Sequence, residues 1–136
     1  MLNPERLKQL DDHQTNILGI LAAGERLLAA PERDAAALAR KRWELTRALM
    51  AYQGFKHREI FDPLAARGGP DQARAARRLK ADCVAMGESF RAYVTRWSAV
   101  SVCDRWDEYH AAATKLVADL RLHLRRERSE TSSLLG

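Results

Sequence analysis

The chain has 136 residues, a length that fits one domain over residues 1–136 with a single core. Its low aromatic content, 7%, favours helix almost throughout. Its net charge of +5 comes from basic clusters that acidic residues dilute and that no aromatic residues interleave, which argues against nucleic-acid binding. No run approaches the roughly 20 apolar residues of a membrane span, and the first residues lack a signal-peptide layout, so we expect a cytoplasmic, all-α protein.

The first predicted helix runs from Pro4 to about Ala29. Asn3 is a suitable N-cap, Pro4 suits the first helical position, and Glu5 places a carboxylate in the first turn. The apolar residues that follow have helical spacing with a gap of one turn. His13 lies beside this gap, and is therefore a candidate for a polar group that faces the core.

The second predicted helix repeats the same start signal at Pro31, continues to Ala66, and is stopped by Gly68 and the residues after it. Its apolar stripe is interrupted on consecutive turns by Gln53 and His57. Polar side chains at such positions are costly unless each finds a partner. The second helix therefore contributes two further candidates for a polar site in the core.

The third predicted helix runs from about Asp71 to Trp97 or Ser98 and presents an apolar face that includes Cys83. The second cysteine, Cys103, lies outside this helix, and the two have no Cys-x-x-Cys spacing. This pattern indicates free thiols rather than a disulfide framework or a cysteine-rich zinc site. Cys83 is then either a small core residue or a metal ligand.

The fourth predicted helix is opened by the segment 101–104, which matches a Ser-x-x-Asp capping box, and it reaches about Ser129 before the tail frays. His123 and Glu127 are one helical turn apart where its apolar stripe continues. An imidazole and a carboxylate at this spacing lie on the same side of a helix. They form a candidate pair of metal ligands.

Four helices of this length with short connections predict an antiparallel, up-down-up-down four-helix bundle. At about 1.5 Å of rise per residue, the three histidines and Cys83 lie at similar heights when the helices alternate in direction. The sequence therefore predicts that His13, His57, Cys83 and His123 meet in one layer of the core. Glu127 follows one turn after His123.

Three segments of the chain resemble the hemerythrin-like family, also called the HHE cation-binding domain. They are LDDHQTNIL in the first helix, QGFKHREIFDPLA in the second and LRLHLRRERSETSSLL in the fourth. The family pattern has a histidine in the first helix and His-x-x-x-Glu in the second. A histidine in the third helix and His-x-x-x-Glu or Asp in the fourth complete it. The resemblance covers nearly the whole chain and implies a bundle that holds a metal centre in its core.

The match to the family pattern differs between helices. His13 aligns with the first-helix ligand, and His123 with Glu127 aligns with the fourth-helix pair. In the second helix, an alignment anchored on Pro63 places Gln53 where the family has histidine and His57 where it has glutamate. The third helix offers Cys83 or Met86 in place of a histidine. Because one of two bridging carboxylates is replaced, the resemblance implies one Fe or Zn ion rather than a di-iron centre.

Two hypotheses about function follow, and neither is enzymatic, since no nucleophile elbow, phosphate loop or Cys-His arrangement is present. In the first, one Fe or Zn ion serves sensing or a stress response, and its candidate site residues are His13, Gln53, His57, Cys83, His123 and Glu127, with Gln53 orienting a ligand or a water. In the second, these polar groups satisfy one another without a metal, and the chain is a structural or protein-interaction module. Its partner is a second copy or another protein, and Trp43 is either a core anchor or part of a dimer face. The sequence does not identify the physiological ligand.

Overall fold

The computed structural model describes residues 4–135, and within this range it contains helices and no strand. This confirms the predicted all-α class. Two shorter elements, the π-helical turn η1 (His57–Phe61) and the helix α3 (Asp62–Arg67), lie between the second and third of four long helices. The long helices are α1 (Pro4–Ala29), α2 (Ala35–Lys56), α4 (Pro70–Ala99) and α5 (Trp106–Leu135).

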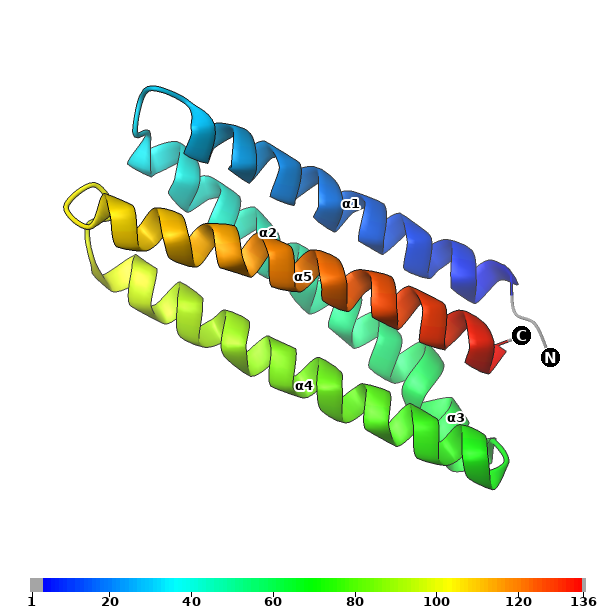
Figure 1. Ribbon diagram of the computed structural model, residues 1–136. Helices are drawn as coiled ribbons and strands as arrows, with labels where there is room; N and C mark the ends of the chain where they lie inside the picture. The colour runs from blue at the N-terminus through cyan, green and yellow to red at the C-terminus, as the bar shows by residue number, and fades with distance from the viewer. Residues whose placement is uncertain (1–3, 136) are drawn as a thin grey trace.

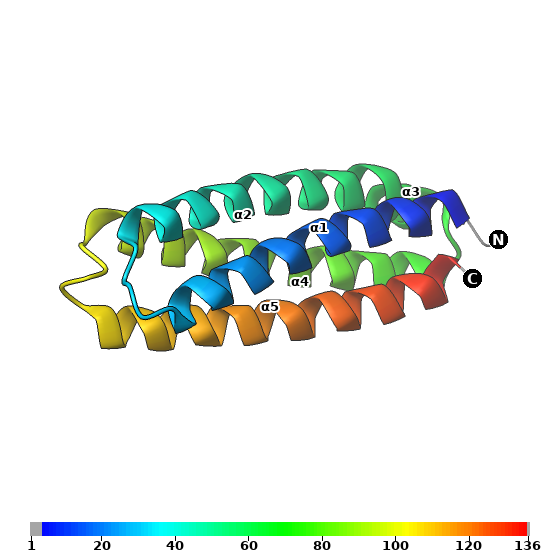
Figure 2. The same ribbon diagram turned by 90° about the horizontal axis from the view of Figure 1, so that it is seen from above.

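The four long helices lie side by side, and consecutive helices are joined at alternate ends of an elongated molecule (Figures 1 and 2). α1 packs against α2 and α5, whereas α4 packs against α2, η1, α3 and α5. The start of α1, the end of α5 and the short helix α3 lie at one end (Figure 1). None of the helices within residues 4–135 combines the length and the apolar character that crossing a membrane requires.

Two groups of buried apolar side chains hold the helices together. The larger group, which we call the main core, occupies the middle of the molecule and the end that contains α3, and it draws residues from all four long helices and from η1. The smaller group, the end cluster, lies where α4 is linked to α5, and it consists of Leu28, Leu38, Trp97, Val102, Tyr109 and Ala113. Burial of these side chains supplies most of the stabilisation of the fold.

The start of the second helix differs from the prediction. α2 begins at Ala35, because Asp34 is the N-cap and its side chain accepts a hydrogen bond from the backbone N–H of Ala37 at 3.0 Å. Pro31 lies in the connection between α1 and α2. Pro31 precedes the helix, but the capping hydrogen bond of the Asp34 side chain determines the first residue of the helix.

The end of the second helix is also interrupted. Where the sequence predicted one continuous helix to Ala66, the backbone widens into the π-helical turn η1 directly after Lys56 and then returns to α-helix in α3. Ile60 and Phe61 are both almost fully buried. The extra residue of the wider turn brings both side chains into the core, and such turns are frequent at functional sites.

The last helix begins later and ends later than predicted. Residues 102–105 form a turn that buries Val102 in the end cluster, so α5 begins at Trp106. The tail does not fray within the described range, since α5 extends to Leu135. Thr131 and Leu135 are buried and continue the inward stripe of α5. This burial offsets the weak helix propensity of the tail.

Candidate functional site

The inward faces of α1 and α2 are rotated by about one residue from the predicted faces. Gln14, rather than His13, is buried between Leu10 and Ile17. In α2 the buried positions after Leu49 are Tyr52, Phe55 and Lys56, so the lysine faces the core. His57 follows at the edge of the core. A polar layer lies in the core, and half of its residues are not those that the sequence predicted: Gln14, Tyr52 and Lys56 join Cys83, His123 and Glu127.

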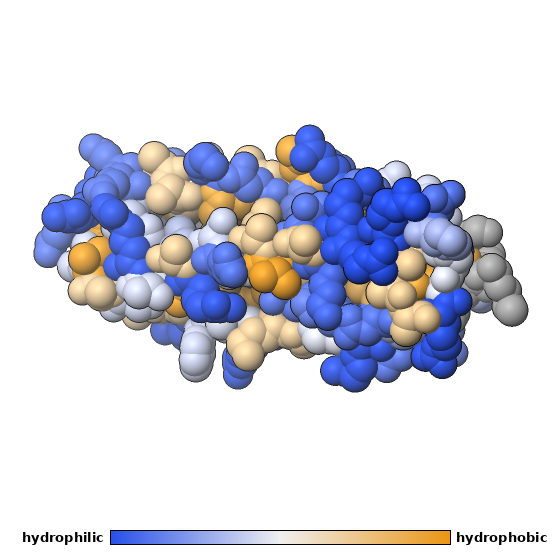
Figure 3. Space-filling model, turned by 90° about the horizontal axis from the view of Figure 1, so that it is seen from below, coloured by the Kyte–Doolittle hydropathy of each residue, from blue (hydrophilic) through white to orange (hydrophobic). Residues whose placement is uncertain are grey.

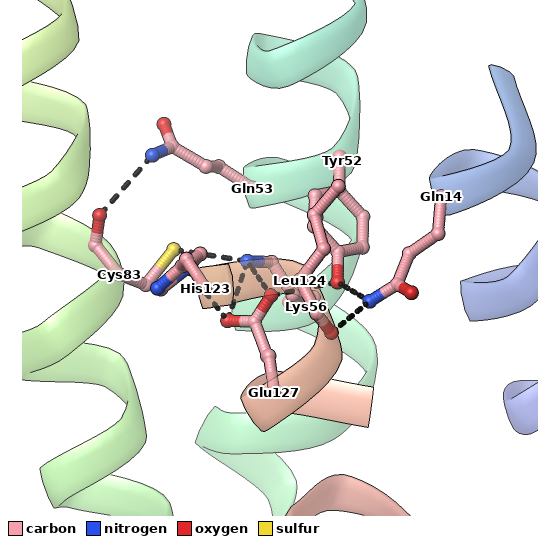
Figure 4. Close-up of polar contacts among 8 residues, drawn as sticks. All are labelled: Gln14, Tyr52, Gln53, Lys56, Cys83, His123, Leu124 and Glu127. Carbon is pink, nitrogen blue, oxygen red and sulfur yellow. Dashed lines mark hydrogen bonds and ion pairs between the residues drawn. The ribbon is translucent and has the colours of Figure 1, made fainter. Parts of the chain in front are cut away.

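A buried ion pair lies at the centre of this layer. Lys56 is 1% exposed and Glu127 is 2% exposed. The Lys56 ammonium donates to both carboxylate oxygens of Glu127, at 2.7 Å each (Figure 4). Breaking one partner of such a pair leaves a charge in a medium that solvates it poorly.

Tyr52 and Gln14 extend the ion pair toward α1. The Tyr52 hydroxyl donates to Glu127 Oε1 at 2.6 Å, and the Gln14 amide Nε2 donates to the Tyr52 oxygen at 2.8 Å. The same amide nitrogen donates to the backbone carbonyl of Leu124 at 2.9 Å, so one side chain of α1 reaches both α2 and α5. Charge-assisted hydrogen bonds of this kind are among the stronger ones in proteins.

Cys83 and His123 complete the arrangement on the side of α4 and α5. Lys56 Nζ donates to the thiol sulfur of Cys83 at 3.3 Å and lies 3.9 Å from the centroid of the Tyr52 ring. The His123 ring, 18% exposed, places Nε2 at 3.5 Å from Glu127 Oε2. We call this set the Lys56 network: Gln14, Tyr52, Lys56, Cys83, His123 and Glu127.

The charge of the Lys56 network is balanced internally. Burial alone raises the pKa of Glu127, but the hydrogen bond from His123 and the charge of Lys56 lower it more, and the pKa settles at about 2. Burial and the neighbouring Glu127 charge raise the pKa of Tyr52, so that its hydroxyl remains a donor. Burial is also the first cause of the raised pKa of the Cys83 thiol. Glu127 is therefore a carboxylate at neutral pH, and the thiol and phenol are protonated.

Two predicted site residues lie beside the network and outside its hydrogen bonds. The His13 ring packs against Phe55, with the ring centroids 5.1 Å apart, and against Tyr52. The His57 ring lies 5.9 Å from that of Phe61, and its Nε2 is buried with no hydrogen-bond partner in the described chain. Burial lowers the pKa of both histidines. Both imidazoles are therefore neutral at neutral pH.

The remaining predicted site residue, Gln53, connects α2 to α4. Its amide Nε2 donates to the backbone carbonyl of Cys83 at 3.2 Å. Gly87 makes this approach possible, since a Cβ atom at that position would lie 2.7 Å from the Gln53 nitrogen. Gln53 thus links α2 to the helix that carries Cys83. Within residues 4–135 its side-chain hydrogen bond goes to this backbone carbonyl and not to a histidine.

One groove reaches the Lys56 network from the surface. It lies between α4 and α5, has a volume of about 360 Å³, and includes His123 and Glu127 in its lining. The groove also carries Asp82, Asp119, Arg126 and Glu130. Figure 3 views the molecule from the side of α4, where hydrophilic residues gather toward the end of the molecule at which α4 begins. Water therefore has access to the outer edge of the network, while the ion pair itself stays buried.

The residues of this layer do not fit a metal centre. The family resemblance implies an ion bound by several imidazoles and carboxylates, but Glu127, the buried carboxylate of the layer, already has the Lys56 ammonium on both oxygens. His13 and His57 make ring contacts instead of meeting Glu127. Within residues 4–135 no three His, Cys, Asp or Glu side chains are grouped so as to hold an ion. A second cation beside the ammonium would be repelled by its charge.

Replacement of His57 by leucine is expected to raise the free energy of unfolding by about 1 kcal/mol, because the variant removes a buried nitrogen that has no partner. Urea unfolding followed by circular dichroism measures this change. His110→Leu is the control, since His110 is exposed and its replacement is expected to have little effect. A clear loss of stability in His57→Leu alone would show that this imidazole has a partner that the fold depends on.

The sequence could have revealed Lys56 through spacing. Positions 45, 49, 52 and 56 follow the three-and-four spacing of one helix face, as do positions 10, 14, 17 and 21. Spacing alone does not single out Lys56, because lysine is almost never fully buried unless it is paired. Comparison of the chain with known protein families, with curated proteins and with solved structures gives no match.

Proposed function

We propose that this chain is an antiparallel, up-down-up-down four-helix bundle of the hemerythrin-like type that works without a metal, as a structural or protein-interaction module of the cytoplasm. The observation that carries this proposal is the Lys56 ammonium on both oxygens of Glu127. This ammonium supplies a positive charge inside the bundle without a metal ion. The motifs around His13, His57 and His123 support the family assignment.

The hydrogen bonding of the network favours a structural role over catalysis. The three protons of the Lys56 ammonium have acceptors in Glu127 Oε1, Glu127 Oε2 and the Cys83 sulfur. Both carboxylate oxygens of Glu127 also contact a second group, Tyr52 on one and His123 on the other. A general base or nucleophile must have a free atom that reaches a substrate. The buried groups here contact one another instead.

The surface offers side chains through which such a module can act. Trp43 is 62% exposed and Met50 is 67% exposed, and both belong to α2. They are seven residues apart, which places them on one side of the helix. The sequence left open whether Trp43 anchors the core, and its exposure favours the surface role.

The proposal predicts that the protein purified without chelator or polyhistidine tag contains far less than one equivalent of Fe or Zn. Plasma mass spectrometry measures the metal content, before and after incubation with either ion and desalting. The reason is that a metal at Glu127 must displace the Lys56 ammonium, with which the carboxylate forms two hydrogen bonds.

The variant His123→Ala provides the matched control for that measurement. It removes the imidazole nearest to Glu127 and leaves the ion pair in place. About one equivalent of metal in the wild-type protein, lost in His123→Ala, would contradict the proposal and restore the metal-binding hypothesis. Equal, low metal content in both proteins is the expected result.

A further inference from the structure

The outer face of α2 carries a stripe of alternating cationic and apolar side chains, which we call the α2 stripe. Its members are Arg40, Trp43, Arg47 and Met50, and all four are exposed. The steps of three, four and three residues between them place the four side chains on one side of the helix. At about 1.5 Å of rise per residue the stripe is about 15 Å long, a length that about three turns of a second helix cover.

A groove between α2 and α4 adjoins the α2 stripe, and Met50 belongs to both. Its volume is about 180 Å³, somewhat more than the roughly 150 Å³ of an apolar cavity that binds benzene. The buried side chains of Leu49 and Phe90 and the half-buried Met86 contribute to its apolar lining. Methionine adapts to partners of different shape and is frequent on surfaces that bind helices. The groove therefore has room for one leucine or phenylalanine side chain of a partner.

The charge around the groove is positive. Arg91 of α4 lines the groove, and no carboxylate is among the described residues that form it. The guanidinium groups of Arg40, Arg47 and Arg91 have no ion pair within residues 4–135. α2 has a single carboxylate, Glu44, and this group lies 3.0 Å from the Lys41 ammonium. Three arginines beside an apolar groove are therefore available to pair with carboxylates of a partner.

We propose that the α2 stripe and the groove together bind an acidic amphipathic helix of another protein. One apolar side chain of that helix enters the groove, and its neighbours on the same face contact Trp43 and Met50. Carboxylates beside this apolar face pair with Arg40, Arg47 and Arg91. The inference rests on the proposed role as an interaction module, and it specifies the chemistry of the partner.

Charge and shape favour such a helix over two other occupants of this face. In a two-fold dimer a surface patch faces itself, so a second copy would bring Arg40 and Arg47 against the same arginines. Like charges across an interface oppose association. An anionic membrane surface attracts the arginines, but it has no side chain of defined shape that fills the groove. A helix with carboxylates and a protruding apolar side chain matches both features.

The test is a titration of a labelled synthetic peptide with the full-length protein, followed by fluorescence anisotropy. The peptide is a helix of about 20 residues with leucines on one face and glutamates beside them. It is expected to bind at least about tenfold more tightly than the same peptide with lysine in place of every glutamate. A peptide that keeps the glutamates and has serine in place of every leucine is also expected to bind at least about tenfold more weakly, because it leaves the groove unfilled.

Two substitutions test the site on the protein. Arg91→Glu is expected to weaken binding of the glutamate peptide about tenfold or more and to strengthen binding of the lysine peptide, a reversal that loss of folding does not produce. Trp43→Ala, at an exposed position, is expected to weaken binding of the glutamate peptide severalfold. Arg125→Glu is the matched control, since Arg125 is exposed on α5, lies outside the groove and changes the net charge equally. It is expected to bind the glutamate peptide within about twofold of the wild type.

Four results would overturn the proposal. They are equal affinity for the glutamate and lysine peptides, equal losses in Arg91→Glu and Arg125→Glu, tighter binding to vesicles of phosphatidylserine than to the peptide, and a dimer of this chain that Trp43→Ala dissociates. Failure of this inference is distinguishable from failure of the proposed function. A bound metal contradicts the metal-free role whatever the peptide does, whereas absence of peptide binding contradicts the acidic-helix site alone.

Discussion

Replacement of Lys56 by methionine is expected to lower the free energy of unfolding by about 3–5 kcal/mol, because it leaves the Glu127 carboxylate buried without its cation. Methionine has a similar length and fills much of the space of the lysine side chain, so the loss of charge dominates the effect. Urea unfolding of the wild type and the variant, followed by far-ultraviolet circular dichroism, gives the difference.

The exposed ion pair between Lys115 and Asp119 provides the control for this substitution. Its atoms are 2.6 Å apart, close to the separation in the buried pair, but the Lys115 side chain is 78% exposed. Lys115→Met is therefore expected to leave the stability almost unchanged. Equal effects of the two substitutions would mean that Lys56 is in contact with water and that the buried ion pair does not form.

Acid is expected to remove roughly 3 kcal/mol of stability through Glu127 alone. The pKa of Glu127 is about 2 in the folded protein against an ordinary value of 4.5, and one pH unit of difference is worth about 1.4 kcal/mol. A carboxyl whose folded pKa is depressed stabilises the fold above its unfolded pKa. This contribution is fully present at neutral pH and disappears as the pH falls from 4.5 toward 2.

Glu127→Gln isolates this contribution from those of other carboxyl groups. Glu25, whose pKa is lowered by its hydrogen bond with Arg121, titrates in both proteins and cancels in the comparison. The difference in unfolding free energy between wild type and Glu127→Gln is expected to shrink between neutral pH and pH 2. Parallel curves across that range would show that Glu127 titrates with an ordinary pKa.

Helix boundaries could be predicted where a local signal sets them. α1 has the predicted limits, Pro4 and Ala29, and α4 differs from the prediction by about one residue at either end. Pro4 and Pro70 each stand at the first helical position, where the fixed backbone angle of proline suits a helix start. Pro31 has the same signal, but Asp34 is closer to the helix and its side chain forms the cap.

Tertiary packing decides the elements that the sequence did not reveal. Nothing in the segment HREIF marks a wider turn, and η1 forms where Ile60 and Phe61 are both buried. Thr131 and Leu135 likewise hold the end of α5 in the helix through burial against the rest of the bundle. A local pattern that predicts fraying carries no information about such contacts.

The candidate site could be located from the sequence, but its chemistry could not. Counting along the helices placed a polar layer at the height of His123, Glu127 and Cys83, and these three residues do contact Lys56 or one another. The inward positions of α1 and α2 differ by one residue from the predicted ones, because spacings of three and of four residues are both compatible with one helix face. A lysine such as Lys56 is rarely fully buried unless it is paired, and its partner Glu127 is 71 residues away in the sequence.

The most direct test of the buried ion pair is a double-mutant cycle between Lys56 and Glu127. Each single variant, Lys56→Met and Glu127→Leu, leaves one buried charge unpaired, whereas the double variant leaves none. The double variant is expected to unfold within about 1 kcal/mol of the wild type, with a coupling of about 3 kcal/mol or more between the two positions. Additive effects without coupling would contradict a lysine–carboxylate pair in the core of this bundle.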